Sequence, residues 1–337
     1  MSFVIRAAAA GDLQALYEMA KLTGGGFTNL PPDRDSLRHK LERSAAAFGR
    51  AEDSLADELF VLVLENAETG DVRGTCQIFS QVGQRWPFYS YRLNALTQYS
   101  KEIDRTVRAE LLSLCTDLEG STEVGGLFLH PSERAGGLGM LLARSRYLFI
   151  AAHRARFGER ILAELRGIID ERGGSPFWDA IGGKFFGMSF QDADEFNATH
   201  GNQFIADLMP KHPVYVAMLP EEARRVIGLP HPSGRAAMRM LENEGFAYEC
   251  YVDIFDGGPT MTAHTDRVKS VRDAVAATVT GATLDKGERV LLATGDLADF
   301  RCCYGLRRLD GGSVAIDARS AKLLRAGQRD RVWSIER

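Results

Sequence analysis

A glycine-rich stretch marks the predicted start of a long helix. Residues 132–142 read SERAGGLGMLL and follow an apolar run, so Gly136, Gly137 and Gly139 lie where backbone N–H groups lack helical partners. Such N–H groups attract phosphate, glycine leaves no Cβ in the way, and Arg134 can add charge-assisted hydrogen bonds. The pattern R-x-x-G-x-G therefore predicts a pyrophosphate-binding turn. A tight strand–helix turn without a ligand would explain the same glycines.

One histidine has the setting of a proton-transfer group. His231 stands in GLPHPSG, and the flanking Pro230 and Pro232 restrict the directions that its side chain can take. Histidine is the side chain best suited to moving protons near neutral pH, although a loop histidine that bonds only to solvent would look the same. Of the others, His130 ends a predicted strand and could lie near the glycine-rich turn, whereas His153 is expected on the solvated side of a helix.

Two common nucleotide-binding motifs and metal-ligand patterns are missing. No G-K-[ST] follows the glycine-rich turn, and its spacing is not the G-x-G-x-x-G of a doubly wound sheet, which disfavours a regulatory nucleotide-binding module. The five cysteines, at positions 76, 115, 250, 302 and 303, form no C-x-x-C pair and no Cys/His ligand spacing. We therefore expect reduced thiols in the core and no metal site.

The elements that must position these residues are strands and helices in alternation. We expect strands at 3–6, 58–66, 72–80, 123–130, 160–170 and 247–256, and helices from residue 13, over 35–48, 137–157 and 175–186, near 201–209, and over 233–245. The second and third strands form a hairpin, so the sheet is antiparallel there. The pair Gly125-Gly126 inside a strand predicts a bulge or a close approach of another backbone.

Short β-like segments separated by Gly and Asp turns fill the chain after about residue 260. We therefore divide it into a main domain, residues 1–268, and a small β-rich C-terminal domain, residues 269–337. The predicted class is α+β, with a mixed, largely antiparallel sheet flanked by helices. The C-terminal domain is expected to contribute stability or assembly and to hold no catalytic group.

The order of these elements resembles the GNAT fold of acyl-CoA N-acyltransferases. The segment Arg134–Gly139 matches the part of that fold that grips the pyrophosphate of coenzyme A. Longer blocks are similar to the arginine N-succinyltransferase family. They read SPFWDAIGGKFF at 175–186, LMPKHPVYV at 208–216 and ENEGFAYECYVDIFDGGPT at 242–260.

This resemblance implies transfer of a succinyl group from succinyl-CoA to the α-amine of L-arginine, in arginine catabolism. It implies no permanently bound cofactor; succinyl-CoA is a co-substrate held at Arg134–Gly139 and by the backbone of Leu127. Without the resemblance, Leu127 would be a plain core leucine. The family's proton-donor histidine lies in a V/L-x-H-P segment that matches His231. Some bacteria carry paralogous subunits, so a homo-oligomer or a paralogous hetero-oligomer is implied.

Other functions are compatible with the same fold. The amine could be ornithine or a polyamine, and the acyl donor could be acetyl-CoA. A non-catalytic partner subunit is a further alternative, against which the intact R-x-x-G-x-G pattern and His231 argue.

The charges of the implied substrates predict four further side chains that bind them. A guanidinium favours a carboxylate fork, and Asp253 and Asp256 in VDIFDGGP are candidates, with a capped turn as the alternative. The carboxylates of the succinyl group and of the amino acid favour Arg or Lys. Arg166 and Lys211 lie in family-like blocks and are the candidates.

Composition limits the class of protein. The chain has 337 residues, of which 45% are hydrophobic and 26% charged, as in soluble globular enzymes. Its net charge of -4 argues against nucleic acid and anionic membranes as partners. No apolar run approaches the ~20 residues of a membrane helix, and the N-terminal apolar stretch is too short for a signal peptide. The expected location is the cytoplasm.

Overall fold

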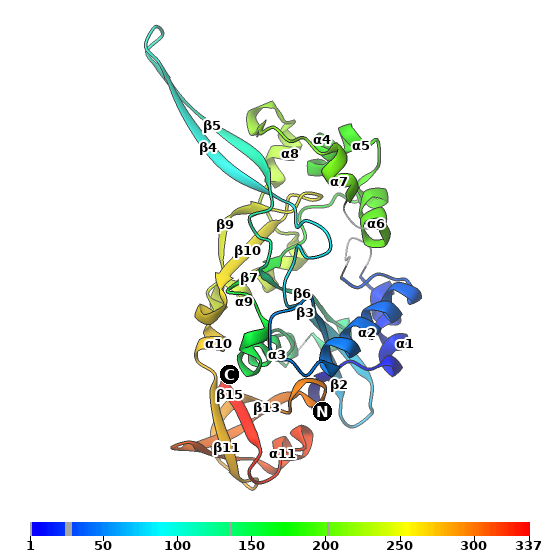
Figure 1. Cartoon of the computed structure of the whole chain (residues 1–337), viewed down its shortest axis with the longest axis vertical. Coiled ribbons are helices and arrows are strands. Elements are labelled where there is room, and N and C mark those ends of the chain that lie inside the picture. The colour runs from blue at the N-terminus through cyan, green and yellow to red at the C-terminus, as the bar shows by residue number, and fades with distance from the viewer. Residues whose placement is uncertain (1, 24–28, 135, 201–202) are drawn as a thin grey trace.

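The computed structural model describes residues 2–23, 29–134, 136–200 and 203–337. Within them, strands join side by side in the order β12-β15-β11-β14-β13-β1-β2-β3-β6-β7-β10-β9-β4-β5-β8 (Figure 1). The strands are β1 (Phe3–Ala7), β2 (Leu59–Asn66), β3 (Val72–Phe79), β4 (Ser90–Ser100), β5 (Arg105–Cys115), β6 (Thr122–Leu129), β7 (Arg160–Glu164), β8 (Val214–Tyr215), β9 (Ala247–Val252), β10 (Pro259–His264), β11 (Val275–Gly281), β12 (Glu288–Thr294), β13 (Arg301–Asp310), β14 (Ser313–Ile316) and β15 (Arg331–Glu336).

Helices cover both faces of the central strands and gather at one end of the molecule (Figure 1). They are α1 (Leu13–Lys21), α2 (Arg34–Gly49), α3 (Leu138–Ala152), α4 (Pro176–Ala180), α5 (Gly182–Phe186), α6 (Phe190–His200), α7 (Gln203–Leu208), α8 (Glu221–Val226), α9 (Arg235–Glu244), α10 (Lys269–Arg272) and α11 (Ala318–Leu324). In the described part of the chain, β6–β7 and β11–β14 pair in parallel and the remaining pairs are antiparallel. The predicted α+β class with a largely antiparallel sheet is confirmed.

The apolar run LFVLVL explains why β2 is central. Strand side chains alternate between faces, so a continuous apolar run suits a strand that is covered on both sides. Leu59, Val61 and Val63 pack with the side chains of α1 and α2. Phe60 and Leu62, one residue on, point to the opposite face and pack with α3.

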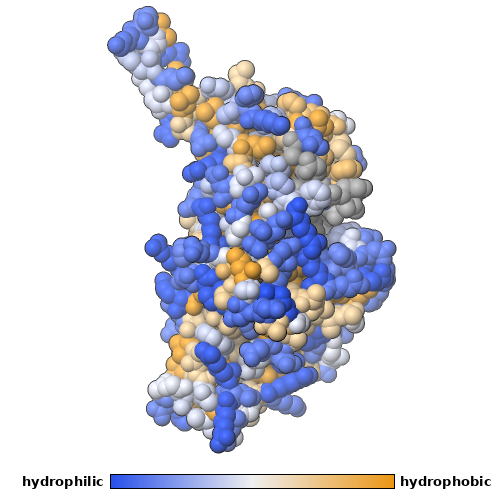
Figure 2. Space-filling model, in the orientation of Figure 1, coloured by the Kyte–Doolittle hydropathy of each residue, from blue (hydrophilic) through white to orange (hydrophobic). Residues whose placement is uncertain are grey.

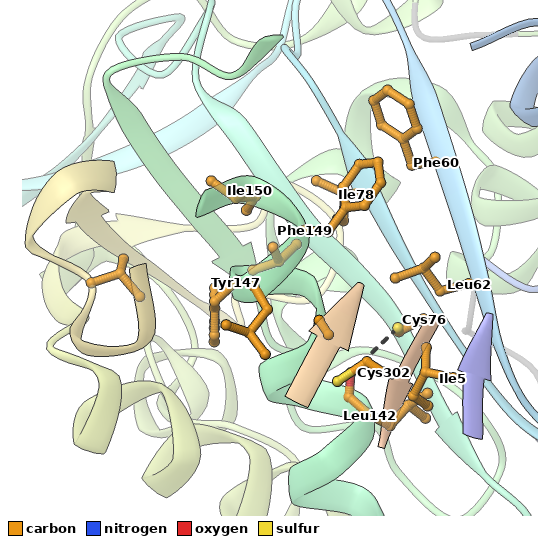
Figure 3. Close-up of a cluster of buried hydrophobic side chains, with 14 of the residues drawn as sticks. Ile5, Phe60, Leu62, Cys76, Ile78, Leu142, Tyr147, Phe149, Ile150 and Cys302 are labelled. Atoms are coloured by element: carbon orange, nitrogen blue, oxygen red, sulfur yellow. Dashed lines mark hydrogen bonds between the residues drawn. The ribbon is translucent and has the colours of Figure 1, made fainter. Parts of the chain in front are cut away.

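The core on the α3 side is shared along the whole chain. Figure 3 shows Ile5 of β1, Leu62 of β2, Phe149 of α3 and Cys302 of β13 in one cluster, where the Cys76 thiol donates to Leu142 O at 3.4 Å. β13 also pairs with β1, so the sheet runs without a break into the C-terminal region. The division of the chain into two domains near residue 268 stays a prediction.

Several predicted boundaries were wrong, for tertiary reasons. The helix expected over 175–186 is two short helices, α4 and α5, because the chain turns at Ile181 (φ -122°, ψ -84°) around the buried Trp178 ring. The strand expected over 160–170 ends at Glu164, where the following loop bonds to other loops instead. No element was predicted for the long β4–β5 hairpin.

Two further expectations are corrected by burial. His153 is only 8% exposed, and its Nε2 accepts a hydrogen bond from the Leu297 N–H at 3.3 Å, so it is not a solvated residue. The C-terminal region covers this end of α3. The spacing of apolar residues within α3 does not show that another part of the chain buries His153. Of the cysteines, three are buried, Cys115 is half-buried and Cys250 is exposed, in contrast to the expected core thiols; none forms a disulfide.

The β4–β5 hairpin projects from the molecule as an arm (Figure 1). Large apolar side chains are exposed along it: Leu96, Tyr99, Ile103 and Val107. Figure 2 shows orange, hydrophobic patches among hydrophilic residues on the arm.

None of the helices in the described residues combines the length and apolar character of a membrane span.

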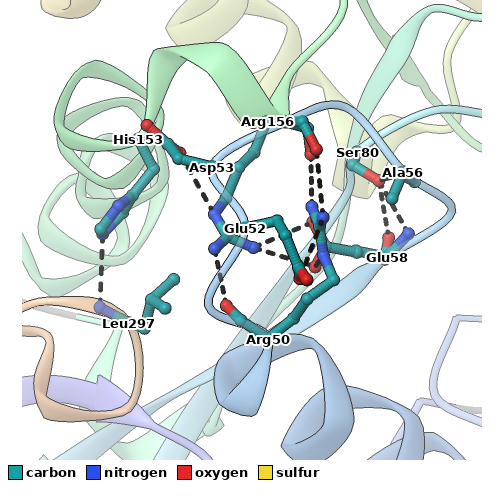
Figure 4. Close-up of polar contacts among 10 residues, drawn as sticks. Arg50, Glu52, Asp53, Ala56, Glu58, Ser80, His153, Arg156 and Leu297 are labelled. Atoms are coloured by element: carbon teal, nitrogen blue, oxygen red, sulfur yellow. Dashed lines mark hydrogen bonds and ion pairs between the residues drawn. The ribbon is translucent and has the colours of Figure 1, made fainter.

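A buried ion-pair network ties α2 and β2 to the segment after α3 (Figure 4). Arg156 is 1% exposed, and its Nη1 lies 3.0 Å from Glu58 Oε1 while its Nη2 donates to Arg50 O at 2.7 Å. Arg50 Nε lies 2.7 Å from the same Glu58 oxygen. A buried guanidinium tolerates burial only with its counter-charge in place.

Glu58→Gln should therefore lower the free energy of unfolding by about 3 kcal/mol, because it removes the buried carboxylate beside Arg156 and leaves only the exposed Asp53, 3.3 Å from Arg156 Nε, as its counter-charge. Urea unfolding measures the change. The matched control is Glu52→Gln: Glu52 is exposed and lies 3.9 Å from Arg50, so its loss should change the stability by less than ~0.5 kcal/mol. Equal effects of the two substitutions would contradict the assignment.

Candidate active site

The sheet opens between two parallel strands. β6 and β7 share only the pairs Thr122–Ile161 and Glu123–Leu162, although β6 continues to Leu129. On their other sides, β7 pairs with β10 along its whole length and β6 pairs with β3. Within the described residues, no strand pairs with the second half of β6 on the side of β7, so an extended ligand can pair with backbone groups there.

The predicted bulge in β6 is confirmed. Gln77 of β3 stands opposite Gly125 and Thr75 opposite Phe128, so β6 carries one extra residue between them. Gly126 has φ +58°, and a Cβ there would lie 2.9 Å from the Gln77 side chain. Both the left-handed backbone and the close approach require glycine. Leu127, which follows, is half-buried beside the core.

The glycine-rich turn has the conformation that a phosphate cradle needs. Gly136 (φ +71°) and Gly137 (φ +82°) are left-handed, Gly137 is the residue before α3, and Gly139 lies in its first turn. Arg134 is exposed, and its guanidinium has no hydrogen bond or ion pair within the described residues. Ala135, inside the predicted segment, lies outside the described residues.

Three loops converge at the open end of β7. The His231 N–H donates to Arg166 O at 2.7 Å, and the Gly167 N–H donates to Asp256 Oδ2 at 2.7 Å. The Gly228 N–H donates to Gly257 O at 2.8 Å. The structure therefore brings together His231, Arg166 and Asp256, which are far apart in the sequence.

The His231 ring is held from one side. Its Nδ1 lies 2.7 Å from Ser233 Oγ and accepts from the Ser233 N–H at 3.3 Å, which leaves Nε2 as the atom available to a ligand. Burial and the nearby positive charge of Arg166 lower the pKa of His231 below its usual value. His130, the other candidate, ends β6 with a matching contact to Ser132 Oγ at 2.7 Å.

Asp253 and Asp256 form turns as well as contributing charge. Asp253 Oδ1 accepts from the N–H groups of Phe255 and Asp256, at 2.7 and 2.8 Å. Asp256 Oδ1 accepts from the Gly258 N–H at 2.8 Å, while its other oxygen holds Gly167. The capped-turn alternative thus describes their hydrogen bonds, and their negative charges face a cluster of further carboxylates.

Sequence reasoning missed those carboxylates. Glu164, the last residue of β7, has a pKa raised well above its usual value by burial and by the charges of Asp253, Glu123 and Asp256. Burial and repulsion from Asp253 raise the pKa of Asp194, on α6, to about 7. Burial likewise raises the pKa of Glu123, at the start of β6. A charged residue inside an apolar strand, as in RILAE and TEVGG, was the available signal.

Cationic groups border the cluster without neutralising it. Lys40 Nζ donates to Asn29 O at 2.7 Å, and burial lowers its pKa to about 8 despite the attraction of Glu123. Arg166 is half-buried, and its Nε has no hydrogen-bond partner among the described residues. Lys211 is exposed on the loop between α7 and β8, and no contact in the described part of the chain links it to His231 or Arg166.

These features together suit a long substrate. The glycine turn can hold a diphosphate, the opening between β6 and β7 can hold an extended chain, and His231 and the carboxylates lie near the end of β7. Because a bound cation stabilises the charged forms of carboxylates whose pKa values are raised, the carboxylate cluster favours a positively charged substrate. Among the described residues, no group of three or more His, Cys, Asp or Glu side chains is arranged to hold a metal ion.

Comparison with known proteins decides the family. The profile of the arginine N-succinyltransferase beta subunit matches residues 3–270, and that of its C-terminal domain matches residues 274–336. The chain belongs to the arginine N-succinyltransferase beta subunit family. It is 41% identical to an arginine N-succinyltransferase of Citrobacter koseri, over 98% of this chain and 96% of that protein.

Two Pseudomonas aeruginosa proteins of this family are also similar. One is named arginine N-succinyltransferase subunit beta and is 40% identical over 96% of this chain and 94% of its own. The other is a solved structure, described as arginine/ornithine succinyltransferase subunit AI. It superposes with a TM-score of 0.90 at 30% identity, covering 99% of this chain and 98% of its own. The family resemblance and the fold expected from the sequence are confirmed.

The raised pKa of Glu164 predicts how stability depends on pH. A carboxyl with a higher pKa in the folded state destabilises the protein above its unfolded pKa, and increasingly as the pH rises toward the folded value. Glu164→Gln should therefore stabilise the free protein more at pH 8 than at pH 5, by about 1–2 kcal/mol in urea unfolding. The exposed Glu171→Gln should show no such difference. A pH-independent effect of Glu164→Gln would refute the electrostatic description.

Proposed function

We propose that this chain transfers the succinyl group of succinyl-CoA to the α-amine of L-arginine, giving N2-succinyl-L-arginine and CoA. Family membership over nearly the full chain supports the reaction. The single structural observation that carries it is the divergence of β6 from β7, which lies between the glycine turn after β6 and the carboxylate cluster around Glu164 at the end of β7.

In the proposal, the acyl donor lies along the opening between β6 and β7. Arg134 and the backbone of Gly136–Gly139 bind the pyrophosphate, and backbone groups of the bulge at Leu127 pair with the pantetheine arm. These contacts place the thioester near His231 and fix its orientation, which removes most of the entropic part of the barrier. CoA binds as a co-substrate and leaves as a product.

The acceptor is recognised by opposite charge. Glu123, Glu164 and Asp253 favour a guanidinium because the cation offsets their mutual repulsion. Arg166, whose Nε lacks a partner within the described residues, is placed to bind a carboxylate of arginine or of the succinyl group. The role of Lys211 in binding a carboxylate stays a prediction without a supporting contact.

The reaction forms a C–N bond, breaks the thioester C–S bond and releases one proton in total. The α-ammonium of arginine first loses a proton, for which a carboxylate with a raised pKa, such as Glu164, is a suitable acceptor. The free amine attacks the thioester carbon. The tetrahedral intermediate then expels the thiolate, which takes a proton from the His231 imidazolium. The second proton of the attacking nitrogen passes to His231 as the amide forms, so the one proton released in total is the one first taken from the α-ammonium.

The acceptor could also be ornithine, because a carboxylate cluster attracts any cationic side chain and one relative is described as an arginine/ornithine succinyltransferase subunit. Assembly with a second subunit, of this chain or of a paralogue, is a further proposal; two relatives are named as subunits.

Release of free thiol over a grid of acyl-CoA and amine pairs tests the function. We expect the highest kcat/KM for succinyl-CoA with L-arginine. A large preference for acetyl-CoA or for ornithine would replace the proposed substrate, and a lack of thiol release with every pair would favour a non-catalytic subunit.

His231→Ala should lower kcat by about 10²–10⁴-fold, the usual contribution of a positioned acid or base. As a proton donor, His231 acts only when protonated, so the variant should also lose the alkaline limb of the kcat–pH profile, on which kcat falls as the pH rises. His39→Ala, an exposed histidine on α2, is the matched control. Near-normal turnover with an unchanged profile in His231→Ala would transfer the role to His130 or to a carboxylate.

A further inference from the structure

The C-terminal region contains a cavity of about 450 Å³ between β12, β13, the start of α11, the segment before β12 and Arg337, which follows β15. This volume is within the range of small-molecule pockets, roughly 300–1,000 Å³. Its lining combines apolar residues such as Val290 and Leu306 with Tyr304 and three arginines, Arg289, Arg319 and Arg337.

The cavity adjoins the glycine-rich turn. Tyr304, which lines it, donates its hydroxyl to Gly137 O at 2.8 Å. Arg337 Nη2 donates to Gly136 O at 3.4 Å, and the same guanidinium lies 4.4 Å from the centre of the Tyr304 ring. Two side chains of the cavity therefore contact the backbone on which the pyrophosphate is proposed to lie.

Positive charge is concentrated here in a chain whose net charge is -4. Two carboxylates, Asp285 and Asp317, also line the cavity, so its three arginines leave an excess of one positive charge. The Asp317 carboxylate accepts from the N–H groups of Leu306 and Ser320, at 2.7 and 2.9 Å, which holds it against the protein backbone. Such a cavity favours an anion, and the guanidinium group matches the geometry of phosphate oxygens.

We propose that this cavity binds the 3′-phosphoadenosine end of coenzyme A. The inference rests on the proposed placement of the CoA pyrophosphate at Arg134–Gly139. The adenosine is joined directly to that pyrophosphate and carries a second phosphate on its ribose. Arg289 then binds the 3′-phosphate, while the apolar lining covers the nucleoside. The C-terminal region thus supplies part of the acyl-donor site without a catalytic group.

Calorimetric titration with CoA and with 3′-dephospho-CoA tests the inference in the full chain. The unaltered protein should bind CoA at least tenfold more tightly than 3′-dephospho-CoA, because the lost phosphate removes charge-assisted hydrogen bonds. Arg289→Ala should weaken CoA binding about tenfold and leave the affinity for 3′-dephospho-CoA within about twofold. Arg308→Ala, an exposed arginine of β13 that does not line the cavity, should change neither affinity.

The outcomes separate the cavity from the proposed function. Equal binding of the two ligands, or equal weakening of both by Arg289→Ala, overturns the cavity assignment while leaving CoA as the acyl carrier. Binding of neither ligand by the unaltered protein overturns the cavity assignment together with the proposed acyl donor.

Discussion

The separation of β6 and β7 is the constraint on which the rest of the structure depends. Two paired residues join these strands at Thr122 and Glu123, and then they diverge. Buried backbone N–H and C=O groups need partners, so a strand that leaves its neighbour inside a sheet must be compensated by a ligand or by other elements. The bulge at Gly126 turns β6 further from a regular ladder. The sheet is thus prepared to receive an extended chain as an additional strand-like partner.

Burial and mutual repulsion disfavour the charged forms of the carboxylates at the end of this opening. Glu164 and Asp256 both have pKa values raised well above the usual range, chiefly by burial. Structural ion pairs elsewhere in the molecule are compensated, as Glu58 is by Arg156 and Glu244 by Arg144, which lies 3.0 Å away. The contrast between compensated and uncompensated buried carboxylates distinguishes a binding site from a structural network. It also explains why a cation is the expected substrate.

The sequence predicted what local patterns determine. The glycine turn before α3, the bulge at Gly125-Gly126 and the central strands depend on residue types at short spacing, and each lies where it was expected. His231 and Asp256 were singled out individually, but their proximity follows from hydrogen bonds between loops of distant segments. Glu164 was overlooked because its importance arises from neighbours contributed by other strands. No periodicity within β7 contains that information.

The C-terminal region, predicted from its short strands to be a small β-rich domain, is joined closely to the rest of the molecule. Its strand β13 pairs with β1 and contributes Cys302 to the central core. Arg144 of α3 also donates to Glu336 O at 2.6 Å. Tyr304 and Arg337 extend this attachment to the glycine turn itself. The carbonyl of one residue and the N–H of the next share a planar peptide unit. Hydrogen bonds to the carbonyls of Gly136 and Gly137 therefore restrain the direction in which the N–H groups of Gly137 and Leu138 point. A preorganised turn binds an anion with less loss of conformational entropy, so the region influences acyl-donor binding through the backbone as well as through its own arginines.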